Sequence, residues 1–480
     1  MIGGRRPGLG PAAVAVALMA LTLWMRWPGV AMYDSVSQYQ QALSGTYSDW
    51  HPPIMARLWR LALAIGPGTA PLFVGQMLLY WGGLGLIAWA LARHGRSGAG
   101  WAVLAAGALP LFVGWTSVVL KDAQMAVCLV AATGLAAPFL LAGRPIARPA
   151  AIPILLLTGY ATLVRGNSFF ATVPFGLALF GWAGVARWPA RAGLALAIMA
   201  LVVVLSPILD QRLMGAEASH VERVLPLYDL AGIAHFVPPA PPAGLSPALW
   251  AQAERRGCYT PYFWNPYGEP AECGAIGDAL AFDEDDGVGL MRHWAAAVIA
   301  HPLAYARHRL GHVNDNLRFL VGAGEPDAIP PLNSEPNRLG LGAPAGWGAR
   351  ALVAAAGAMA ASPLGWPSVW LAAALALLWA GWRVAGGQAA LGRALALSAA
   401  VMSLSFGVVS IASDLRYHLW SMIAAALAAV LLVDAGLPRG RAARAAAMVA
   451  AVALIAVVAR LLLPAPYVPL PARVPPPPAV

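Results

Sequence analysis

The sequence contains little charge. Only 11% of its 480 residues are Asp, Glu, Lys or Arg, and 60% are apolar, whereas a soluble domain has about 25% charged and roughly 45–50% apolar residues. This shortage of charge excludes a soluble enzyme and a disordered chain. Three cysteines are too few for a disulfide scaffold. The 50 glycines and 41 prolines have no collagen-like period.

The charge that is present is mainly basic, with 31 Lys and Arg against 21 Asp and Glu and a formal net charge of +10. In a soluble protein this excess would suggest a nucleic-acid partner. Here the arginines fall in short gaps between apolar runs, which is typical of membrane topology. The basic balance therefore predicts a lipid bilayer as the partner, and no nucleic acid.

Apolar runs long enough to cross a bilayer recur along the chain, since a span needs about 20 apolar residues. We expect eleven spans, near residues 11–31, 69–92, 99–119, 123–142, 150–164, 168–186, 192–209, 363–382, 394–412, 417–436 and 445–463. No small-residue cleavage site follows the first run, so we interpret it as an uncleaved helix. The sequence thus predicts an all-α, polytopic membrane protein.

The arginines predict the orientation, because cytoplasmic gaps are enriched in basic residues. With the N-terminus in the cytoplasm, the cytoplasmic gaps hold only basic charges: Arg5 and Arg6, Arg93 and Arg96, Arg144 and Arg148, Arg187 and Arg191, Arg383 and Arg393, and Arg439, Arg441 and Arg444. The stretch 349–361 would invert every later gap if it crossed the membrane, so we interpret it as an interfacial or re-entrant helix. The C-terminus is then expected outside.

These spans divide the chain into blocks. Residues 1–209 form a seven-span module, 210–346 a long periplasmic segment, 347–463 a four-span module and 464–480 a Pro-rich tail. The long segment exceeds ordinary loop length, so it is expected to be a small folded domain or a lid. In it, Cys258 and Cys273 are expected to pair if the compartment is oxidising. Residues 291–320 predict a helix at the membrane surface.

Asp34 opens the first external loop, and topology alone does not explain it. It is either a helix N-cap or a carboxylate at the membrane boundary, where its pKa can be tuned for work as a base. The same loop holds Asp49 and ends in His51-Pro52-Pro53, which would turn the chain back into the interface.

Three further external turns carry charged or polar pairs: Lys121 and Asp122, Arg165 and Asn167, and Arg416 and Tyr417. Each has a structural alternative, namely a local ion pair, a snorkelling lysine or a buried partner for arginine. Taken together, acids at these helix ends suit deprotonation of an acceptor or metal binding, and arginine suits an anionic lipid headgroup. The pattern predicts chemistry on a lipid phosphate at the outer membrane face. The sequence contains no P-loop and no GxSxG motif, which disfavours ATP-driven transport and serine-hydrolase chemistry.

The motifs resemble the multi-span GT-C glycosyltransferases, specifically the protein-mannosyltransferase and aminoarabinose-transferase-like group. That group has an acid in the first external loop and then an HPP step, similar to Asp34 and His51-Pro52-Pro53. It has an acid at the next turn, similar to Asp122, and a basic residue in a GxATLxK-like stretch, similar to 159–165 here. A late basic-plus-Tyr step resembles Arg416-Tyr417. The likeness covers about residues 1–180 best and 414–433 weakly. Ser35 and Arg165 depart from the group's usual Glu and Lys.

The resemblance implies a GT-C-like transferase in a bacterial inner membrane, with its active site facing the periplasm. It would move a sugar from a polyprenyl-phosphate-linked donor to a glycan, lipid or protein acceptor. Asp34 would be the general base and Asp122 a second acid that orients the acceptor or a metal. Donor phosphate would bind to the basic residues Arg165, Arg416 and Lys121. Further members of the site would be His51, Asp49, Asn167 and Tyr417.

Two points stay open at this stage. A divalent cation is the one cofactor that the resemblance suggests. The alternative function is a transporter or flippase for a lipid-linked or anionic solute, which would use the same charges as a binding site.

Overall fold

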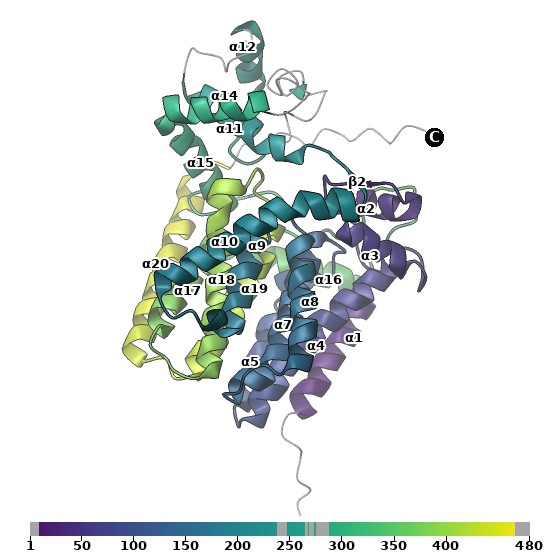
Figure 1. The fold of residues 1–480 in the computed structure, drawn as a ribbon, viewed down its shortest axis with the longest axis vertical. Helices are drawn as coiled ribbons and strands as arrows, with labels where there is room; N and C mark the ends of the chain where they lie inside the picture. Colours follow the sequence, from purple (N-terminus) through teal and green to yellow (C-terminus); the bar gives the residue numbers. More distant parts are fainter. Residues whose placement is uncertain (1–8, 238–246, 265–266, 268–272, 275–287, 466–480) are drawn as a thin grey trace, which may run out of the picture. The chain divides into compact units, whose positions relative to one another are not determined.

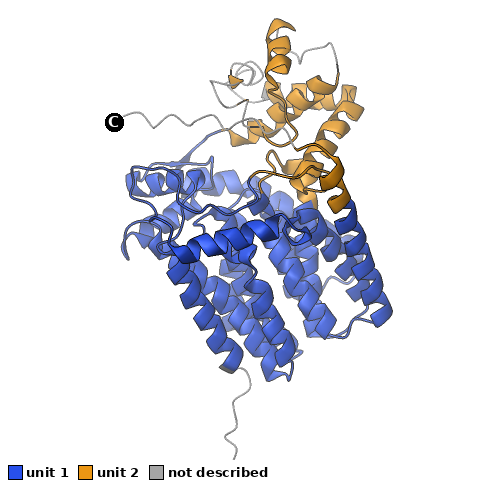
Figure 2. Ribbon diagram, turned by 180° about the vertical axis from the view of Figure 1, so that it is seen from behind, with its two compact units in different colours: residues 1–219, 327–403, 415–455 blue, residues 220–326, 404–414, 456–480 orange. Residues whose placement is uncertain are grey.

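The computed structural model describes residues 9–237, 247–264, 267, 273–274 and 288–465 (Figure 1). Most of the predicted Pro-rich tail, from residue 466 onward, therefore lies outside the described residues. The chain divides into two compact units (Figure 2). Unit 1 comprises residues 1–219, 327–403 and 415–455, and unit 2 comprises 220–326, 404–414 and 456–480. Most of both predicted helical modules belongs to unit 1.

Unit 1 is built almost entirely from helices. Its N-terminal part contains α1 (Leu9–Arg26), α2 (Tyr33–Ser44), α3 (Ile54–Ala62), α4 (Ala70–Arg93), α5 (Ser97–Gly107), α6 (Pro110–Thr116), α7 (Lys121–Leu141), α8 (Arg148–Leu163), α9 (Phe169–Leu179), η1 (Gly181–Gly184), α10 (Trp188–Pro207) and η2 (Ile208–Leu213). Its C-terminal part contains α16 (Trp347–Ala360), η5 (Pro363–Gly365), α17 (Pro367–Gly381), most of α18 (Gly387–Val409), η6 (Leu415–His418), α19 (Leu419–Asp434) and most of α20 (Arg439–Leu462). Two short strands, β1 (Tyr47–Ser48) and β2 (Ala216–Glu217), pair in parallel.

Every predicted apolar run contains a helix. Among the described residues, six helices are long and apolar enough to cross a membrane: Ala70–Arg93, Lys121–Leu141, Trp188–Leu213, Gly387–Val409, Leu415–Asp434 and Arg439–Leu462. The bent pair α5 and α6 would make a seventh, and α1, α9 and α17 are shorter apolar helices. The all-helical, multi-pass character is thereby confirmed. The count of eleven spans stays a prediction.

The predicted run 99–119 is divided because of a proline. The axes of α5 and α6 differ by 61°, and Pro110 is the first residue of α6. A proline disfavours helical geometry in the residue before it, and Leu109 accordingly has an extended ψ of 129°. The sequence contained this signal at Pro110, which the span prediction overlooked.

The centre of unit 1 is the contact between α4 and α7. A Cβ atom on Gly83 would lie 2.7 Å from the carbonyl oxygen of Val130, and one on Gly134 would lie 2.5 Å from the carbonyl oxygen of Gly83. The two backbones therefore touch with no side chain between them, as small residues allow in membrane helices. Helix α7 also packs against α8 and α19, which buries it on most sides.

Helix α10 has the opposite environment. The side chains of Leu196, Val203 and Val204 are 66%, 52% and 64% exposed. An apolar helix that leaves so much surface uncovered is explained by contact with lipid.

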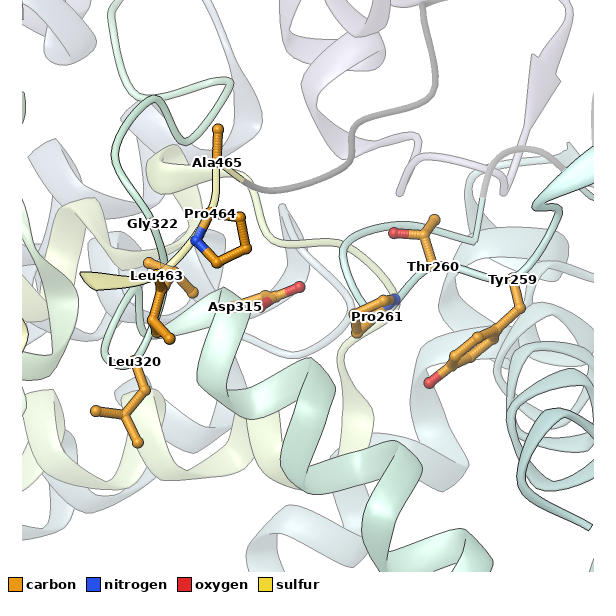
Figure 3. A pocket seen from close by; sticks show the side chains of 10 residues that line it. Tyr259, Thr260, Pro261, Asp315, Leu320, Gly322, Leu463, Pro464 and Ala465 are labelled. Atoms are coloured by element: carbon orange, nitrogen blue, oxygen red, sulfur yellow. The ribbon is translucent and has the colours of Figure 1, made fainter. Parts of the chain in front are cut away.

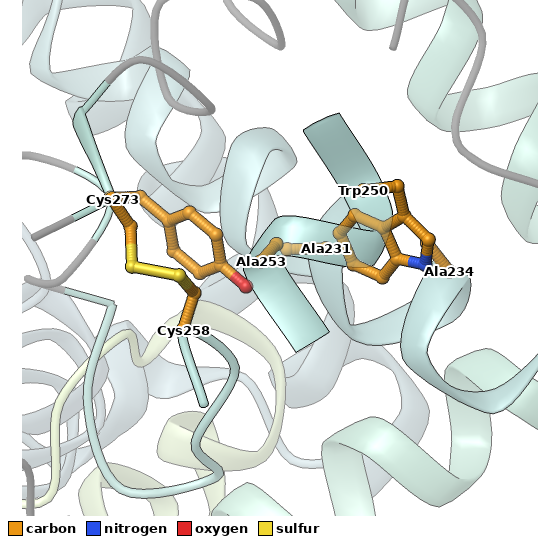
Figure 4. Packing of buried hydrophobic residues seen from close by; sticks show 7 residues of the cluster. Ala231, Ala234, Trp250, Ala253, Cys258 and Cys273 are labelled. Atoms are coloured by element: carbon orange, nitrogen blue, oxygen red, sulfur yellow. A yellow bond between two sulfur atoms is a disulfide. The ribbon is translucent and has the colours of Figure 1, made fainter. Parts of the chain in front are cut away.

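Unit 2 contains η3 (Val221–Arg223), α11 (Val224–Phe236), α12 (Pro247–Arg256), α14 (Val288–Ala300) and α15 (Pro302–Asn316). Cys258 and Cys273, the pair expected from the sequence, form a disulfide. Figure 4 shows this disulfide near Ala231, Ala234, Trp250 and Ala253. Tyr267 belongs to the same apolar cluster. The single helix expected over 291–320 is instead two helices, because Pro302 begins the second one and His301 leaves helical geometry.

Candidate functional site

Four predicted external turns come together in unit 1. Asp34 is in the first turn of α2, and Lys121 and Asp122 are the first two residues of α7. Arg165 follows the end of α8, and Arg416 is in η6, directly before α19. The turns are far apart in the sequence, so only the packing of the helices brings their charges within contact.

Asp34 lies among three nitrogen-bearing side chains. Its Oδ2 atom is 3.4 Å from Lys121 Nζ and 3.4 Å from an Arg416 guanidinium nitrogen. Its Oδ1 atom is 3.7 Å from His51 Nε2. The helix N-cap is Met32, two residues earlier, so the capping role considered for Asp34 is not the one seen. Lys121 is the only lysine in the sequence.

His51 connects to the same group through its other nitrogen. Lys121 Nζ is 2.7 Å from His51 Nδ1. An ammonium group can only donate, so Nδ1 accepts and the proton of the neutral ring is on Nε2, toward Asp34. Burial and the charge of Lys121 together lower the pKa of His51 to about 3, although the charge of Asp34 opposes them. His51 is therefore neutral at pH 7.

The pKa of Asp34 has two opposing causes. Burial alone would raise it, but the charges of Arg416 and Lys121 outweigh burial and hold the pKa well below its usual range. Asp34 is consequently a carboxylate at neutral pH and has two cations as partners. In the free protein the two cations therefore stabilise the ionised form of Asp34, which makes this carboxylate a weak base.

A second charged group lies beside the first. The Arg165 guanidinium makes a direct ion pair with Asp122, and its Nε atom donates to Asn167 Oδ1 at 2.7 Å. The ring of Tyr417 lies between the two groups, with its centroid 4.2 Å from the guanidinium carbon of Arg165 and 5.6 Å from that of Arg416. Aromatic faces attract guanidinium groups at such distances, so Tyr417 links the two groups.

The two groups differ in access. The side chains of Asp34 and Lys121 are 14% and 15% exposed, whereas that of Asp122 is 1% exposed. The Asp34 and Lys121 side chains therefore keep a small exposed surface. Asp122 is sealed behind Arg165, which favours a role in holding that arginine over contact with an acceptor.

Ser35 positions Asp34 relative to Lys121. Its hydroxyl accepts from the backbone N–H of Met32 at 3.2 Å and donates to the carbonyl of Val119 at 2.5 Å. The backbone N–H of Val119 in turn donates to Val30 at 2.8 Å. These bonds hold the start of α2 against the segment that leads into α7. The sequence showed Ser35 only as a departure from the resembled group, and its role was not predicted.

Asp49 lies in a different set of contacts. Its carboxylate accepts from the backbone N–H and the hydroxyl of Ser219, both at 2.6 Å, and from Gln211 Nε2 at 3.0 Å. These bonds fix the end of the β1–β2 pair. Of the predicted site residues, Asp49 thus has a structural explanation, whereas the others gather around Asp34 and Arg165.

An apolar groove begins one helical turn along α7 from Lys121. It has a volume of about 240 Å³ and is lined mainly by leucines of α3, α4 and α8, together with Val127 and Cys128 of α7. At its polar end, Tyr160 donates to Gln124, and Gln124 Nε2 is 3.5 Å from Gln76 Oε1. A short length of apolar chain fits this lining, and a charged group does not.

Unit 2 has a separate cavity of about 510 Å³. Figure 3 shows the Asp315 carboxylate directed into it, with Pro261 and Tyr259 on the opposite wall. Burial raises the pKa of Asp315 to about 6. The Tyr259 hydroxyl contacts His308 Nδ1 at 3.0 Å, and His308 Nε2 contacts Asp229 at 3.1 Å. None of the predicted site residues lines this cavity.

A metal site was left open by the sequence. Over the described ranges, no group of three or more His, Cys, Asp or Glu side chains is placed to hold a metal ion. The divalent cation suggested by the resemblance therefore gains no ligand set among these residues.

In comparisons with known proteins, no family model, no curated protein and no solved structure matches this chain. The resemblance to GT-C enzymes therefore rests on the sequence motifs.

Proposed function

We propose that this chain is a glycosyltransferase that uses a polyprenyl-phosphate-linked sugar at the periplasmic face of a bacterial inner membrane. In this proposal the chain crosses the membrane eleven times, with the N-terminus in the cytoplasm. The observation that carries the proposal is one partly exposed carboxylate, Asp34, held beside two cations, Lys121 and Arg416. A phosphate leaving group needs the cations, and a nucleophilic acceptor needs the carboxylate.

The cations would act on the donor. As the bond between the sugar C1 atom and the phosphate oxygen breaks, the electron pair stays with the phosphate, and negative charge develops there. Fixed cations stabilise such charge most effectively where water is largely excluded, and Lys121 and the Arg416 side chain are only 15% and 10% exposed. Arginine adds a planar pair of donors that matches phosphate oxygens.

The carboxylate would act on the acceptor. The acceptor oxygen or nitrogen forms a bond to C1 and loses its proton to Asp34, an effect typically worth about 10²–10⁴-fold in rate. A single displacement of this kind inverts the anomeric carbon, by analogy with one-step glycosidases. No covalent intermediate with the protein is needed.

The donor's lipid would lie in the groove beside α7. Val127 and Cys128 line that groove, and Lys121 is on the same helix one to two turns earlier. A phosphate at Lys121 would thus place its polyprenyl chain at the groove entrance. Arg165 and Asp122 would support Tyr417, and through it Arg416, from the buried side.

The Asp34→Asn variant tests the proposal. Asn keeps the shape of Asp but cannot accept the proton, so transfer should fall at least about a hundredfold while thermal stability stays near normal. The measurement is made in a deletion strain that carries either form of the gene. Wild-type protein should restore one envelope glycan, and the variant should leave the glycan absent and the lipid-linked sugar accumulated.

Glu335→Gln is the matched control, because it removes an exposed acid whose backbone N–H bonds to Ala31, near α2. It should behave as wild type. Transfer near the wild-type rate with Asn at position 34 would contradict the base role. A lipid-linked sugar that accumulates only on the cytoplasmic leaflet would instead support the flippase alternative.

A further inference from the structure

The charges around Asp34 do not balance. Lys121 and Arg416 carry one positive charge each, Asp34 carries one negative charge, and His51 is neutral. The adjacent Arg165 and Asp122 cancel each other. The group therefore has a surplus of one positive charge. A polyprenyl phosphodiester carries one negative charge. Its binding would therefore balance the group, with Lys121 and Arg416 against Asp34 and the phosphate.

The two cations share a single carboxylate oxygen. Lys121 and Arg416 both lie 3.4 Å from Oδ2 of Asp34. These distances are longer than the roughly 2.7–2.9 Å of a close charge-assisted hydrogen bond. Asp34 is thus a shared counter-ion of both cations and not the tight partner of either one.

On the basis of the function proposed above, we propose that Asp34 occupies the position of the donor phosphate in the free protein, and that donor binding takes Lys121 and Arg416 over from it. Asp34 then loses the cations that weaken it as a base and is left to receive the acceptor's proton. The donor must therefore bind before the acceptor can be deprotonated. The transfer itself is unchanged: C1 bonds to the acceptor, the phosphate leaves with the electron pair, and Asp34 takes the proton.

Competition between Asp34 and the phosphate can be tested by binding measurements alone, without an assay of sugar transfer. If the phosphate and Asp34 use the same cations, removing the charge of Asp34 must strengthen phosphate binding. The probe is farnesyl methyl phosphate, a prenyl phosphodiester with one negative charge that does not titrate above pH 3. Its affinity for the purified full-length protein is measured by isothermal titration calorimetry in detergent. Asp34→Asn should bind it about tenfold more tightly than wild type, within the usual range of coupling between sites.

The control variant Glu335→Gln should leave the affinity unchanged, which separates local competition from a general loss of negative charge. Lys121→Met should abolish tight binding. Equal affinities of Asp34→Asn and wild type would overturn this inference and leave the proposed function standing. No binding by any form would overturn the proposed function as well.

A second measurement uses the unaltered chain and does not depend on folding of a variant. Asp34 faces Lys121 of α7, Arg416 of η6 and His51 before α3. When the phosphodiester takes the two cations, the pKa of Asp34 should return toward its ordinary value near 4. A group that binds its proton more strongly in the complex makes binding tighter as the pH falls.

Affinity of wild type for the probe should therefore rise as the pH falls from about 5 to about 3, and affinity of Asp34→Asn should not. His51 is the other group that gains a proton in acid. If the pH dependence persists unchanged in Asp34→Asn, it belongs to His51, and the competition is refuted.

Discussion

At the level of single residues, the pair of Asp122 and Arg165 is almost fully hidden from water. The two side chains are 1% and 8% exposed and in direct contact. Removing one partner of a buried ion pair typically costs about 3–5 kcal/mol, because the remaining charge is left uncompensated. We expect Asp122→Asn and Arg165→Met each to lower the free energy of unfolding by about that amount.

The double variant Asp122→Asn with Arg165→Met should lose clearly less than the sum of the two single losses, because no uncompensated charge is left. Denaturation of the full chain in detergent, followed by tryptophan fluorescence, measures all three. Additive losses would show that the two side chains do not act as a pair. Substitution by lysine at position 165 should be only partly tolerated, since lysine lacks the planar guanidinium that faces Tyr417.

The sequence predicted which charged residues would gather better than it predicted which of them would pair. Asp34, Lys121, Arg165 and Arg416 were singled out because charge at a membrane boundary is costly without a purpose. Which charges would pair was not predictable, because pairing depends on helix packing that a single sequence does not specify. The bonds of Asp49 to Ser219 were not predictable either, and its place in the site stays a prediction.

At the level of elements, two adjacent glycines of α4 offer a matched comparison. An added Cβ would lie 2.7 Å from the Val130 carbonyl oxygen at Gly83, and would meet nothing within 4 Å at Gly82. Gly82→Ala should be neutral or gain up to about 1 kcal/mol from helix propensity. Gly83→Ala should instead lose about 1–3 kcal/mol, because α4 and α7 must move apart.

Thermal unfolding of the two variants in detergent would measure the difference. Because Lys121 begins α7, the Gly83→Ala change should also weaken binding of a prenyl phosphodiester, whereas Gly82→Ala should not. Equal stability of the two variants would mean that the backbone contact between α4 and α7 is looser than the structure has it.

The disulfide is the main covalent element of unit 2. It closes a loop with a sequence separation of 15 residues, for which loop-closure entropy predicts a contribution of roughly 3 kcal/mol. Peptide mapping without reduction should find Cys258 and Cys273 linked. A reducing agent should lower the unfolding temperature of the wild-type chain and leave that of a Cys258→Ser, Cys273→Ser variant unchanged. Two freely alkylated thiols in the isolated protein would contradict the assignment.

Element positions were largely predictable, because long apolar runs have few alternatives to the helix. The errors were at prolines within runs, which divide α5 from α6 and α14 from α15. Pro110 starts α6 and Pro302 starts α15. The predictions followed the hydrophobicity of each run and did not take its helix-breaking proline into account.

At the level of the whole molecule, the predicted orientation can be tested with reporter fusions. The loops predicted in the cytoplasm meet within unit 1, since Arg96 and Asp434 form an ion pair at 2.8 Å and Gln388 donates to the same carboxylate at 2.8 Å. Asp34, Lys121 and Arg416 meet in another place. This separation agrees with an odd number of crossings between any cytoplasmic loop and any external one.

Fusions after Arg96, Arg148, Arg191, Arg393 and Arg441 should report a cytoplasmic location, and fusions near Gly268 and Pro475 a periplasmic one. Helix α16, with 14 residues, is the critical element, because the side of every later loop depends on whether it crosses the membrane. A cytoplasmic reporter at Pro475 would mean that α16 crosses the membrane. Arg416 and Asp34 would then be on opposite sides, in conflict with their contact.

The contacts of Asp34 also have a consequence for synthesis of the chain. Ribosomes make the N-terminal part first, so Asp34 and Lys121 exist together long before Arg416 is made. During that time the carboxylate has one cation and the pair is neutral. The positive surplus arises only when the helices around Arg416 join the rest. The Asp34 group of a nascent chain therefore has no net attraction for anionic lipids, and acquires it only when Arg416 has joined.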